Sequence, residues 1–435
     1  MLLIFASAIT NRLRYITDLL ISKMLGVKVE ITRYTDEFNK YNGPKISYSD
    51  KPLLDGLFIE AKQLLFDVNI VQQAVRITDL DDVPIFFHVD HPKAVLPFDP
   101  FAAAFFMVSR YEEYLPYQKD RYGRFPAEES LAWQGGFLEI PVVHLWAEMI
   151  GRALLRHYPG LTLKHREYRF MPTIDVDHAY AYRGRTLKRT LGGIGRDMLH
   201  GQFADIFLRF RVLTGLAADP YDNYSYILKV HEPYDHVPLY FVLFADYGAD
   251  DNNVTVTSGT FHTLLRVLDQ YQGVGIHPSL SSNTRSLILQ TEFESLSNVI
   301  HRKVTISRQH FLSLAMPQTY RSLIQLGITD DYSMGYASNP GFRAGITIPF
   351  RFFDLASNET TPLVVHPVSV MDVTLRDYLR LSTEESLDTI IGVIKTIRSV
   401  NGDCVSLWHN ESLGETGRWK GWRRVYEEMV KAAST

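Results

Sequence analysis

Two aspartates close one of the most apolar stretches of the sequence. Residues 169–178 read Arg-Phe-Met-Pro-Thr-Ile-Asp-Val-Asp-His, so Asp175 and Asp177 follow a short apolar run with one residue between them. Such a run predicts a buried strand. The acids mark its end, because a carboxylate is not buried without a partner. In parallel barrels and open α/β sheets, ligands bind at this end of the strands. The alternative is a loop in which one aspartate caps a helix and the other is hydrated.

Three further predicted strands also end in ionisable side chains. They are residues 274–277, which end at His277, residues 304–307, which lead to Arg308 and His310, and residues 404–408, which lead to His409. If these strands are neighbours in one parallel sheet, their carboxyl ends converge on one cleft.

Carboxylates and histidines that converge in a cleft can carry out hydrolysis. A carboxylate and a histidine can bind a divalent metal with a position open for water, and the metal lowers the pKa of that water towards about 7. A second carboxylate can accept a proton, and a guanidinium beside it holds it ionised and oriented. A separate histidine can protonate a departing amine. These residue types therefore favour hydrolysis of an amide or an ester.

The elements that position these residues follow a repeated β–α order. Beyond residue 166, strand-like residues 239–244 precede helix-like residues 260–271 and 284–301. Ser382 and Glu385 form a capping box that opens a last amphipathic helix. The residues before this region also alternate, with strands at 2–5, 27–32 and 138–143 and helices at 12–24 and 145–156. A turn at residues 158–160 separates the two regions.

We therefore expect an α/β protein with two domains. A smaller α/β accessory domain would occupy residues 1–165, and the domain that carries the cleft would occupy residues 166–435. Two polar segments receive a structural interpretation. Arg110, Glu112 and Glu113 end an apolar helix at residues 100–114, where a hydrated helix end with local ion pairs is favoured over a binding edge. Asp250-Asp251-Asn252-Asn253 is interpreted as a loop tip.

Composition limits the possible partners and locations. The 435 residues are 46% hydrophobic and 22% charged, which is ordinary for a globular protein. The net charge of −4 is spread along the chain and predicts neither a nucleic-acid nor a membrane partner. The single cysteine, Cys404, cannot form an internal disulfide. Residues 1–9 are interpreted as a first strand because Arg12 and Arg14 follow the apolar run instead of preceding it, so we expect a cytoplasmic protein.

From about residue 166 onwards the sequence resembles the NodB-homology polysaccharide deacetylases of carbohydrate esterase family 4, which have a distorted (β/α) barrel. Thr173-Ile174-Asp175-Val176-Asp177 is similar to the first motif of that family, and three later segments are similar to its other motifs. These are Gly275-Ile276-His277-Pro278-Ser279, Arg308-Gln309-His310 and Leu407-Trp408-His409. Residues 327–333 and 341–345 resemble a divergent branch, and the whole chain resembles Bacteroidetes members with an uncharacterised N-terminal domain.

The resemblance implies a role for each of these residues. Asp175 would be the general base, oriented by Arg308, and His409 the general acid. Asp177 and His277 would bind a divalent metal, zinc in the first instance. The family has a second metal histidine four residues after the first, but here that position is Ser281, whose hydroxyl is a poor zinc ligand. His310 could supply the missing ligand, or it could be a packed histidine.

The expected function is removal of acetyl groups from N-acetylated sugars or from a polysaccharide precursor, with a carbohydrate as the partner. Two alternatives stay open. One is a glycan-binding protein that kept the barrel and lost the chemistry, which the change at Ser281 favours. The other is a metal-independent hydrolase of a non-sugar amide.

Overall fold

The larger sheet carries the residues for which the sequence predicts chemistry. The computed structural model describes residues 1–53, 56–164, 166–248, 250–271 and 273–435. Within them, nine strands pair in the order β12-β13-β11-β10-β9-β8-β7-β15-β14, all parallel to their neighbours except β12. The strands are β7 (Arg169–Val176), β8 (Leu239–Val242), β9 (Val274–Ile276), β10 (Ile306–Ser307), β11 (Asp330–Met334), β12 (Phe350–Asp354), β13 (Glu359–Pro367), β14 (Val370–Met371) and β15 (Asp403–His409).

This sheet curls back on itself. Strand β14 follows β13 after only Val368 and Ser369. The backbone N–H of Val368 donates to Met334 at the end of β11, and the N–H of Ser369 donates to Val405 of β15. One extended stretch of chain thus pairs first with β11 and then with β15. The result is a curled, barrel-like sheet. The α/β class is the one that the alternation of strands and helices predicted.

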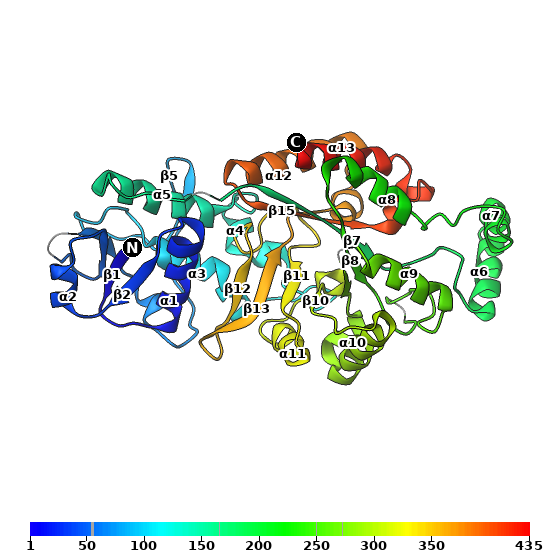
Figure 1. Cartoon of the computed structure of the whole chain (residues 1–435), viewed down its shortest axis with the longest axis horizontal. Helices are drawn as coiled ribbons and strands as arrows, with labels where there is room; N and C mark the ends of the chain where they lie inside the picture. The colour runs from blue at the N-terminus through cyan, green and yellow to red at the C-terminus, as the bar shows by residue number, and fades with distance from the viewer. Residues whose placement is uncertain (54–55, 165, 249, 272) are drawn as a thin grey trace.

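Helices cover the outside of the curled sheet (Figure 1). They include α8 (Tyr224–His231), α9 (Gly259–Asp269), α10 (Ser286–Ile300), α11 (Gln318–Leu326), α12 (Thr383–Ser399) and α13 (Trp422–Ser434). The buried residues of α9 are Phe261, Leu264, Leu265 and Leu268, which lie on one face of the helix. The capping box of Ser382 and Glu385 opens α12 as expected. Among the described residues, no helix is long and apolar enough to cross a bilayer.

A second, four-stranded parallel sheet lies at the N-terminal end of the chain, in the order β2-β1-β3-β4. Its elements, with the hairpin that follows and the nearby helices, are β1 (Leu2–Ala6), α1 (Asn11–Thr17), β2 (Val29–Thr32), α2 (Thr35–Lys40), β3 (Lys45–Ser49), β4 (Leu57–Glu60), β5 (Thr78–Leu80), β6 (Val83–Ile85), α3 (Pro100–Val108), α4 (Leu131–Gln134) and α5 (Val142–His157). The strand expected at residues 138–143 is wrong. Pro141 precedes the first turn of α5, and Val142 and Val143 are buried within this helix, so their β-propensity is overridden.

Buried ion pairs join the two sheets. Arg110 and Glu113, which follow α3, are almost fully buried, so the hydrated helix end expected there is wrong, although the local ion pair is present at 2.7 Å. Glu113 also accepts hydrogen bonds from Arg343 of the larger unit, at 2.9 and 2.7 Å, and Arg110 donates to the Arg343 carbonyl. Such a cluster is stable because each buried charge has an opposite charge beside it.

The same hydrophobic core extends through both sheets. It runs from Leu2 of β1, through the wholly buried helix α3, to residues of α13. Tyr15 of α1 reaches the larger sheet, where its hydroxyl donates to the carbonyl of Arg351 at 2.7 Å. A domain boundary at residue 165 therefore stays a prediction, and His165 itself lies outside the described residues.

A buried histidine in α5 makes this junction sensitive to pH. Nε2 of His144 accepts a hydrogen bond from the backbone N–H of Thr347 at 3.1 Å. Burial, together with the positive charge of Arg166, lowers the pKa of His144 to about 3. The unfolded chain, with a histidine pKa near 6.5, therefore takes up this proton before the folded chain does.

We predict that His144 contributes stability fully above about pH 6.5 and loses it as the pH falls towards 3. The contribution should decline by about 1.4 kcal/mol per pH unit in that range. The measurement is the free energy of urea unfolding against pH for the wild type and for His144→Gln, whose amide oxygen can still accept the hydrogen bond. In the variant, the free energy of unfolding should change less steeply with pH, by the amount that corresponds to the uptake of about one proton on unfolding. Equal slopes would contradict the assignment of a neutral buried imidazole.

Candidate active site

The parallel strands bring all six predicted site residues to one end of the larger sheet. Asp175 lies in β7, where it is paired in register with Phe241 of β8 and His409 of β15. The other residues follow the ends of their strands, namely Asp177 after β7, His277 after β9, and Arg308 and His310 after β10. The carboxyl ends of parallel strands meet at one edge, so residues far apart in the sequence become neighbours.

Asp177 lies at the centre of the group. Its Oδ1 is 3.3 Å from Nε2 of His277, and its Oδ2 is 3.5 Å from Nε2 of His310. A third histidine, His409, has its Nε2 3.6 Å from the same Oδ2. Burial opposes ionisation of Asp177, but His310 and His277 outweigh it and hold the pKa of the carboxyl well below its ordinary value.

Two of these histidines are oriented through their other ring nitrogen. Nδ1 of His277 is 2.6 Å from the carbonyl of Arg308, and Nδ1 of His310 is 2.9 Å from Oδ1 of Asp251. An oxygen acceptor at Nδ1 places a proton there and leaves Nε2 facing Asp177. Histidines that bind metals in proteins are held in this manner.

The donor set fits a divalent cation. One carboxylate oxygen of Asp177 and the Nε2 atoms of His277 and His310 can all lie within 4.8 Å of one another. Oδ1 of Asp177 is buried and forms no hydrogen bond with the described residues, although a buried carboxylate oxygen needs a partner. One carboxylate and two imidazoles with a position left over for water form a set typical of catalytic zinc sites.

Ser281 does not replace the missing family histidine as a ligand. Its hydroxyl donates to Oδ2 of Asp251 at 3.3 Å, and Asp251 in turn holds His310. Burial lowers the pKa of His310, but Asp177 and Asp251 together raise it to about 9, because the imidazole lies between two carboxylates. His310, and not Ser281, therefore lies within reach of Asp177 and His277, and Ser281 belongs to the group that supports His310.

Asp175 is held by a buried guanidinium. Nη1 of Arg308 donates to Oδ1 of Asp175 at 2.7 Å, while its Nε donates to the carbonyl of Tyr332 at 2.9 Å. Arg308 is fully buried against the ring of Phe241. Its permanent charge is balanced by the carboxylate of Asp175. Oδ2 of Asp175 lies 3.6 Å from Nε2 of His277, next to the Asp177 cluster.

His409 is held by a carboxylate that the sequence did not reveal. Asp372, which follows β14, accepts from the backbone N–H of His409 at 2.9 Å and lies 2.8 Å from its Nδ1. Burial lowers the pKa of His409, but Asp372, with Asp177 and Asp175, raises it to about 10. A carboxylate at Nδ1 favours the protonated imidazole, which can donate a proton from Nε2.

Asp251 and Asp372 contact two of the predicted site histidines, and the sequence prediction missed both. Asp251 falls in the segment interpreted as a loop tip, yet it is almost fully buried, so that interpretation is wrong for this residue. Asp372 follows a strand of two residues, which is too short to show any periodicity. The signal that could have found Asp372 is the run Val-Ser-Val-Met-Asp at residues 368–372, which is apolar and ends in an acid.

The site opens into a cavity of about 470 Å³. Five of the six predicted residues line it, and Arg308 lies behind Asp175. Arg121 and Tyr122, from the N-terminal part of the chain, line the same cavity. The ring of Tyr122 stacks on Phe311 with centroids 4.7 Å apart, and Arg124 donates to the Phe311 carbonyl at 2.7 Å. The cleft is therefore built from both parts of the chain.

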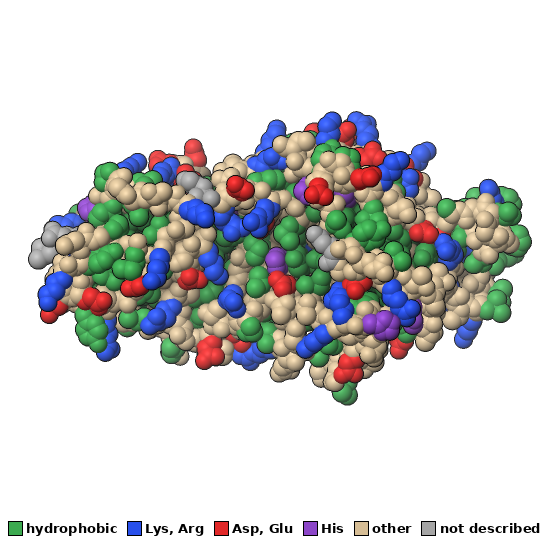
Figure 2. All heavy atoms as spheres, in the orientation of Figure 1, with side chains coloured by type: hydrophobic (Ala, Val, Ile, Leu, Met, Phe, Trp, Pro, Cys, Tyr) green, Lys and Arg blue, Asp and Glu red, His purple; other side chains and the backbone are tan. Residues whose placement is uncertain are grey.

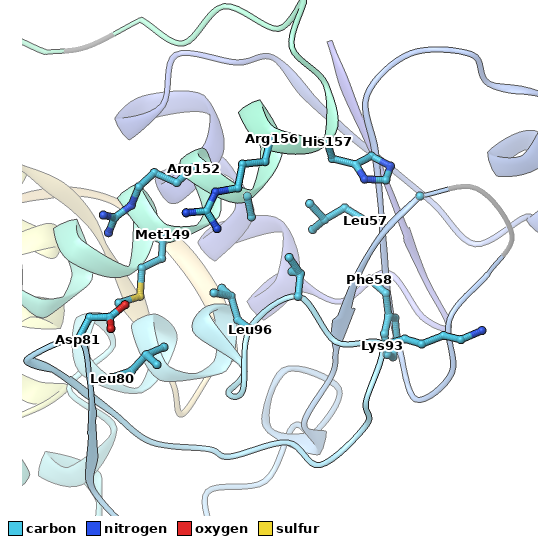
Figure 3. Close-up of a pocket in the computed structure, with 13 residues that line it drawn as sticks. Leu57, Phe58, Leu80, Asp81, Lys93, Leu96, Met149, Arg152, Arg156 and His157 are labelled. Atoms are coloured by element: carbon cyan, nitrogen blue, oxygen red, sulfur yellow. The ribbon is translucent and has the colours of Figure 1, made fainter.

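A second cavity, of about 440 Å³, lies near the amino end of β4 (Figure 3). Figure 3 shows Arg152 and Arg156 on helix α5 near an apolar floor that includes Leu57 and Leu96. Asp81 is the one carboxylate among its lining residues, so it lacks the paired acids that the hydrolytic chemistry requires. Within the described chain, the Asp177 cluster is the one group of three potential metal ligands.

Comparison with known proteins gives a family for the N-terminal part alone. Residues 2–159 match a family of unknown function, DUF7033, which covers less than half of the chain and assigns no activity. No curated protein sequence is significantly similar to the chain.

Three solved structures are similar at low identity. A putative polysaccharide deacetylase from Mycobacterium smegmatis is 15% identical, with a TM-score of 0.41 over 62% of this chain and 85% of that chain. Puue allantoinase is 11% identical, with a TM-score of 0.37 over 72% and 91%. Agd3, described as a novel carbohydrate deacetylase, is 9% identical, with a TM-score of 0.36 over 68% of this chain and 54% of that chain. Because all three TM-scores are below 0.5, the site's own geometry carries the argument that follows.

We predict that Asp177→Ala, His277→Ala and His310→Ala each abolish stoichiometric binding of zinc, because each removes one of three ligands. Asp251→Asn should weaken binding by about 10- to 100-fold, since it removes only the support of His310. Elemental analysis and calorimetric titration would measure this, with His88→Gln, away from the cluster, as the matched control. Unchanged zinc content in His310→Ala would exclude His310 as the third ligand.

Proposed function

We propose that the chain is an amide hydrolase that removes an acetyl group from an N-acetylated sugar, on a distorted barrel of the NodB-homology type. One observation carries the proposal. A carboxylate fixed by Arg308 and an imidazole fixed by Asp372 both lie within 3.6 Å of members of the Asp177–His277–His310 cluster. A base and an acid beside a potential cation site are the components that amide hydrolysis requires.

The residues divide the reaction between them. A divalent cation bound by the cluster would polarise the acetyl carbonyl and lower the pKa of a water molecule. Asp175, which keeps Oδ2 free of Arg308, accepts the proton of the attacking water. His409 delivers its Nε2 proton to the departing sugar nitrogen. The bond between the carbonyl carbon and the nitrogen breaks, and the products are acetate and a free amine.

The walls of the cavity suit a sugar ring. The lining includes the aromatic rings of Tyr122, Phe311 and Tyr378, and aromatic faces pack against the C–H faces of sugars. Its volume of about 470 Å³ is within the usual range for a small-molecule site. The size and the lining of the cavity therefore favour a small saccharide, or the end of a polysaccharide, as the substrate.

We expect Asp175→Asn to lower kcat for acetate release by about 10²- to 10⁴-fold while the protein keeps its fold and its bound metal, because only the base is lost. His409→Gln should have an effect of similar size. Acetate release from N-acetylglucosamine oligomers would be measured for both, with His178→Gln as a control that alters a residue of the cavity wall. Normal turnover in Asp175→Asn would contradict the assignment of Asp175 as the general base.

The same assay separates the alternatives. Turnover that survives exhaustive chelation would replace the proposal by a metal-independent hydrolase. Saturable binding of the oligomers without any acetate release would replace it by a glycan-binding protein.

Tyr122 tests the contribution of the N-terminal part of the chain. Tyr122→Ala should raise KM several-fold and leave kcat nearly unchanged, because the ring lines the cavity but makes no contact with Asp175 or His409. Tyr34→Ala, an exposed tyrosine elsewhere in the N-terminal part, is the matched control. An unchanged KM in Tyr122→Ala would show that this wall does not contact the substrate.

A further inference from the structure

A helical hairpin projects from the molecule on the side away from the N-terminal sheet. Helix α6 (Leu187–Leu199) and helix α7 (Phe203–Leu213) follow β7 and precede α8. Figure 1 shows them at the far end of the larger unit, outside the ring of helices that covers the sheet. They play no part in the chemistry proposed above.

Both helices turn apolar side chains to the solvent. In α7, Phe203, Phe207 and Phe210 are 68%, 64% and 63% exposed, and their spacing places them on one face of the helix. In α6, Leu187, Leu191 and Met198 form a similar exposed stripe. Figure 2 shows hydrophobic side chains gathered over this projection. Large apolar side chains gathered on an exposed surface in this way mark an interaction site.

Positive charge is concentrated in the same segment. Residues 183–216 contain seven arginines and lysines and two aspartates, a net charge of +5 in a chain whose total is −4. Arg183 and Arg209 are paired with Asp222 and Asp197. Lys188, beside the α6 stripe, has no ion-pair partner among the described residues. The sequence-wide charge predicted no membrane partner, but that average conceals this local excess.

The hairpin is braced so that its apolar face stays outward. Arg209 of α7 and Asp197 of α6 form a buried ion pair at 2.6 Å on the inner side of the hairpin. The Arg209 guanidinium also lies over the ring of Tyr182, 4.6 Å from its centroid. Gly193 allows this close approach, because a Cβ at that position would be 2.8 Å from an Arg209 nitrogen. The exposed phenylalanines therefore cannot turn inward without breaking a buried ion pair.

We propose that the α6–α7 hairpin docks this protein onto an anionic lipid surface. Helices that lie on a bilayer combine an apolar face with flanking arginines and lysines, which is the pattern here. Lipid phosphates complement the positive charge beside the stripes. A second copy of the chain fits less well, because a twofold contact would bring two positively charged faces together.

The position of the hairpin gives this docking a consequence. The chain leaves the sheet after Asp177, at the edge where the candidate active site lies, and residues 178–186 lead from there to α6. Arg418 lines both the site cavity and the hollow beneath the hairpin. Docking would therefore hold the open edge of the cleft near the lipid surface. The docking itself does not depend on the proposed deacetylase activity.

Vesicle sedimentation with the full chain tests the proposal. We expect the wild type to pellet with vesicles of phosphatidylcholine and phosphatidylglycerol in about a two-to-one ratio, to bind pure phosphatidylcholine weakly, and to be released in part by raised salt. Phe207→Asp/Phe210→Asp should reduce binding by at least about tenfold. Leu287→Asp, which changes an equally exposed leucine of α10, should bind as the wild type does.

A second variant guards against misfolding of the first. Lys188→Gln/Arg196→Gln keeps the apolar stripes and should weaken binding to the anionic vesicles by several-fold, with a smaller dependence on salt. Wild-type protein that stays in the supernatant would overturn the proposal, and so would binding that neither pair of substitutions reduces. A concentration-dependent dimer that Phe207→Asp/Phe210→Asp abolishes would instead assign the face to a second copy of the chain.

Discussion

Every charge buried at the carboxyl end of the larger sheet has to be balanced by another, and this constraint organises the site. Arg308 is fully buried because Asp175 is beside it, and the pKa of His310 is raised because the imidazole lies between Asp177 and Asp251. A cation in the same place would take over the role of the His310 proton, since it also neutralises Asp177. The ion pairs therefore fix the positions of the side chains that form the cleft.

The same constraint operates between the two sheets. Arg110 and Arg343 share Glu113 in a region from which water is excluded, so neither part of the chain can leave the other without exposing an unbalanced charge. This fixes the loop that carries Tyr122 against Phe311, at the wall of the cleft. The N-terminal part is therefore a structural component of the candidate site, whatever other role it has.

Charge is distributed very unevenly over the molecule. The strand ends collect acids and histidines in balanced groups, while the α6–α7 hairpin carries unbalanced positive charge beside exposed aromatic rings. Balanced groups can be buried and can position a substrate, whereas unbalanced ones stay at the surface and attract an opposite surface. Residues 178–186 link the two regions, because they join the end of β7 to α6.

The sequence by itself predicted the alternation of strands and helices around the site and the six residues at the strand ends, because apolar periodicity and an acid or histidine that closes a strand are local signals. It also identified Ser281 as a departure from the family pattern. It did not predict that Val142 and Val143 belong to a helix. Tertiary structure alone decided that Asp251 supports His310, that Asp372 supports His409 and that Arg110 is buried. Each of these depends on a partner between 37 and 233 residues away, and local pattern carries no information about such pairs.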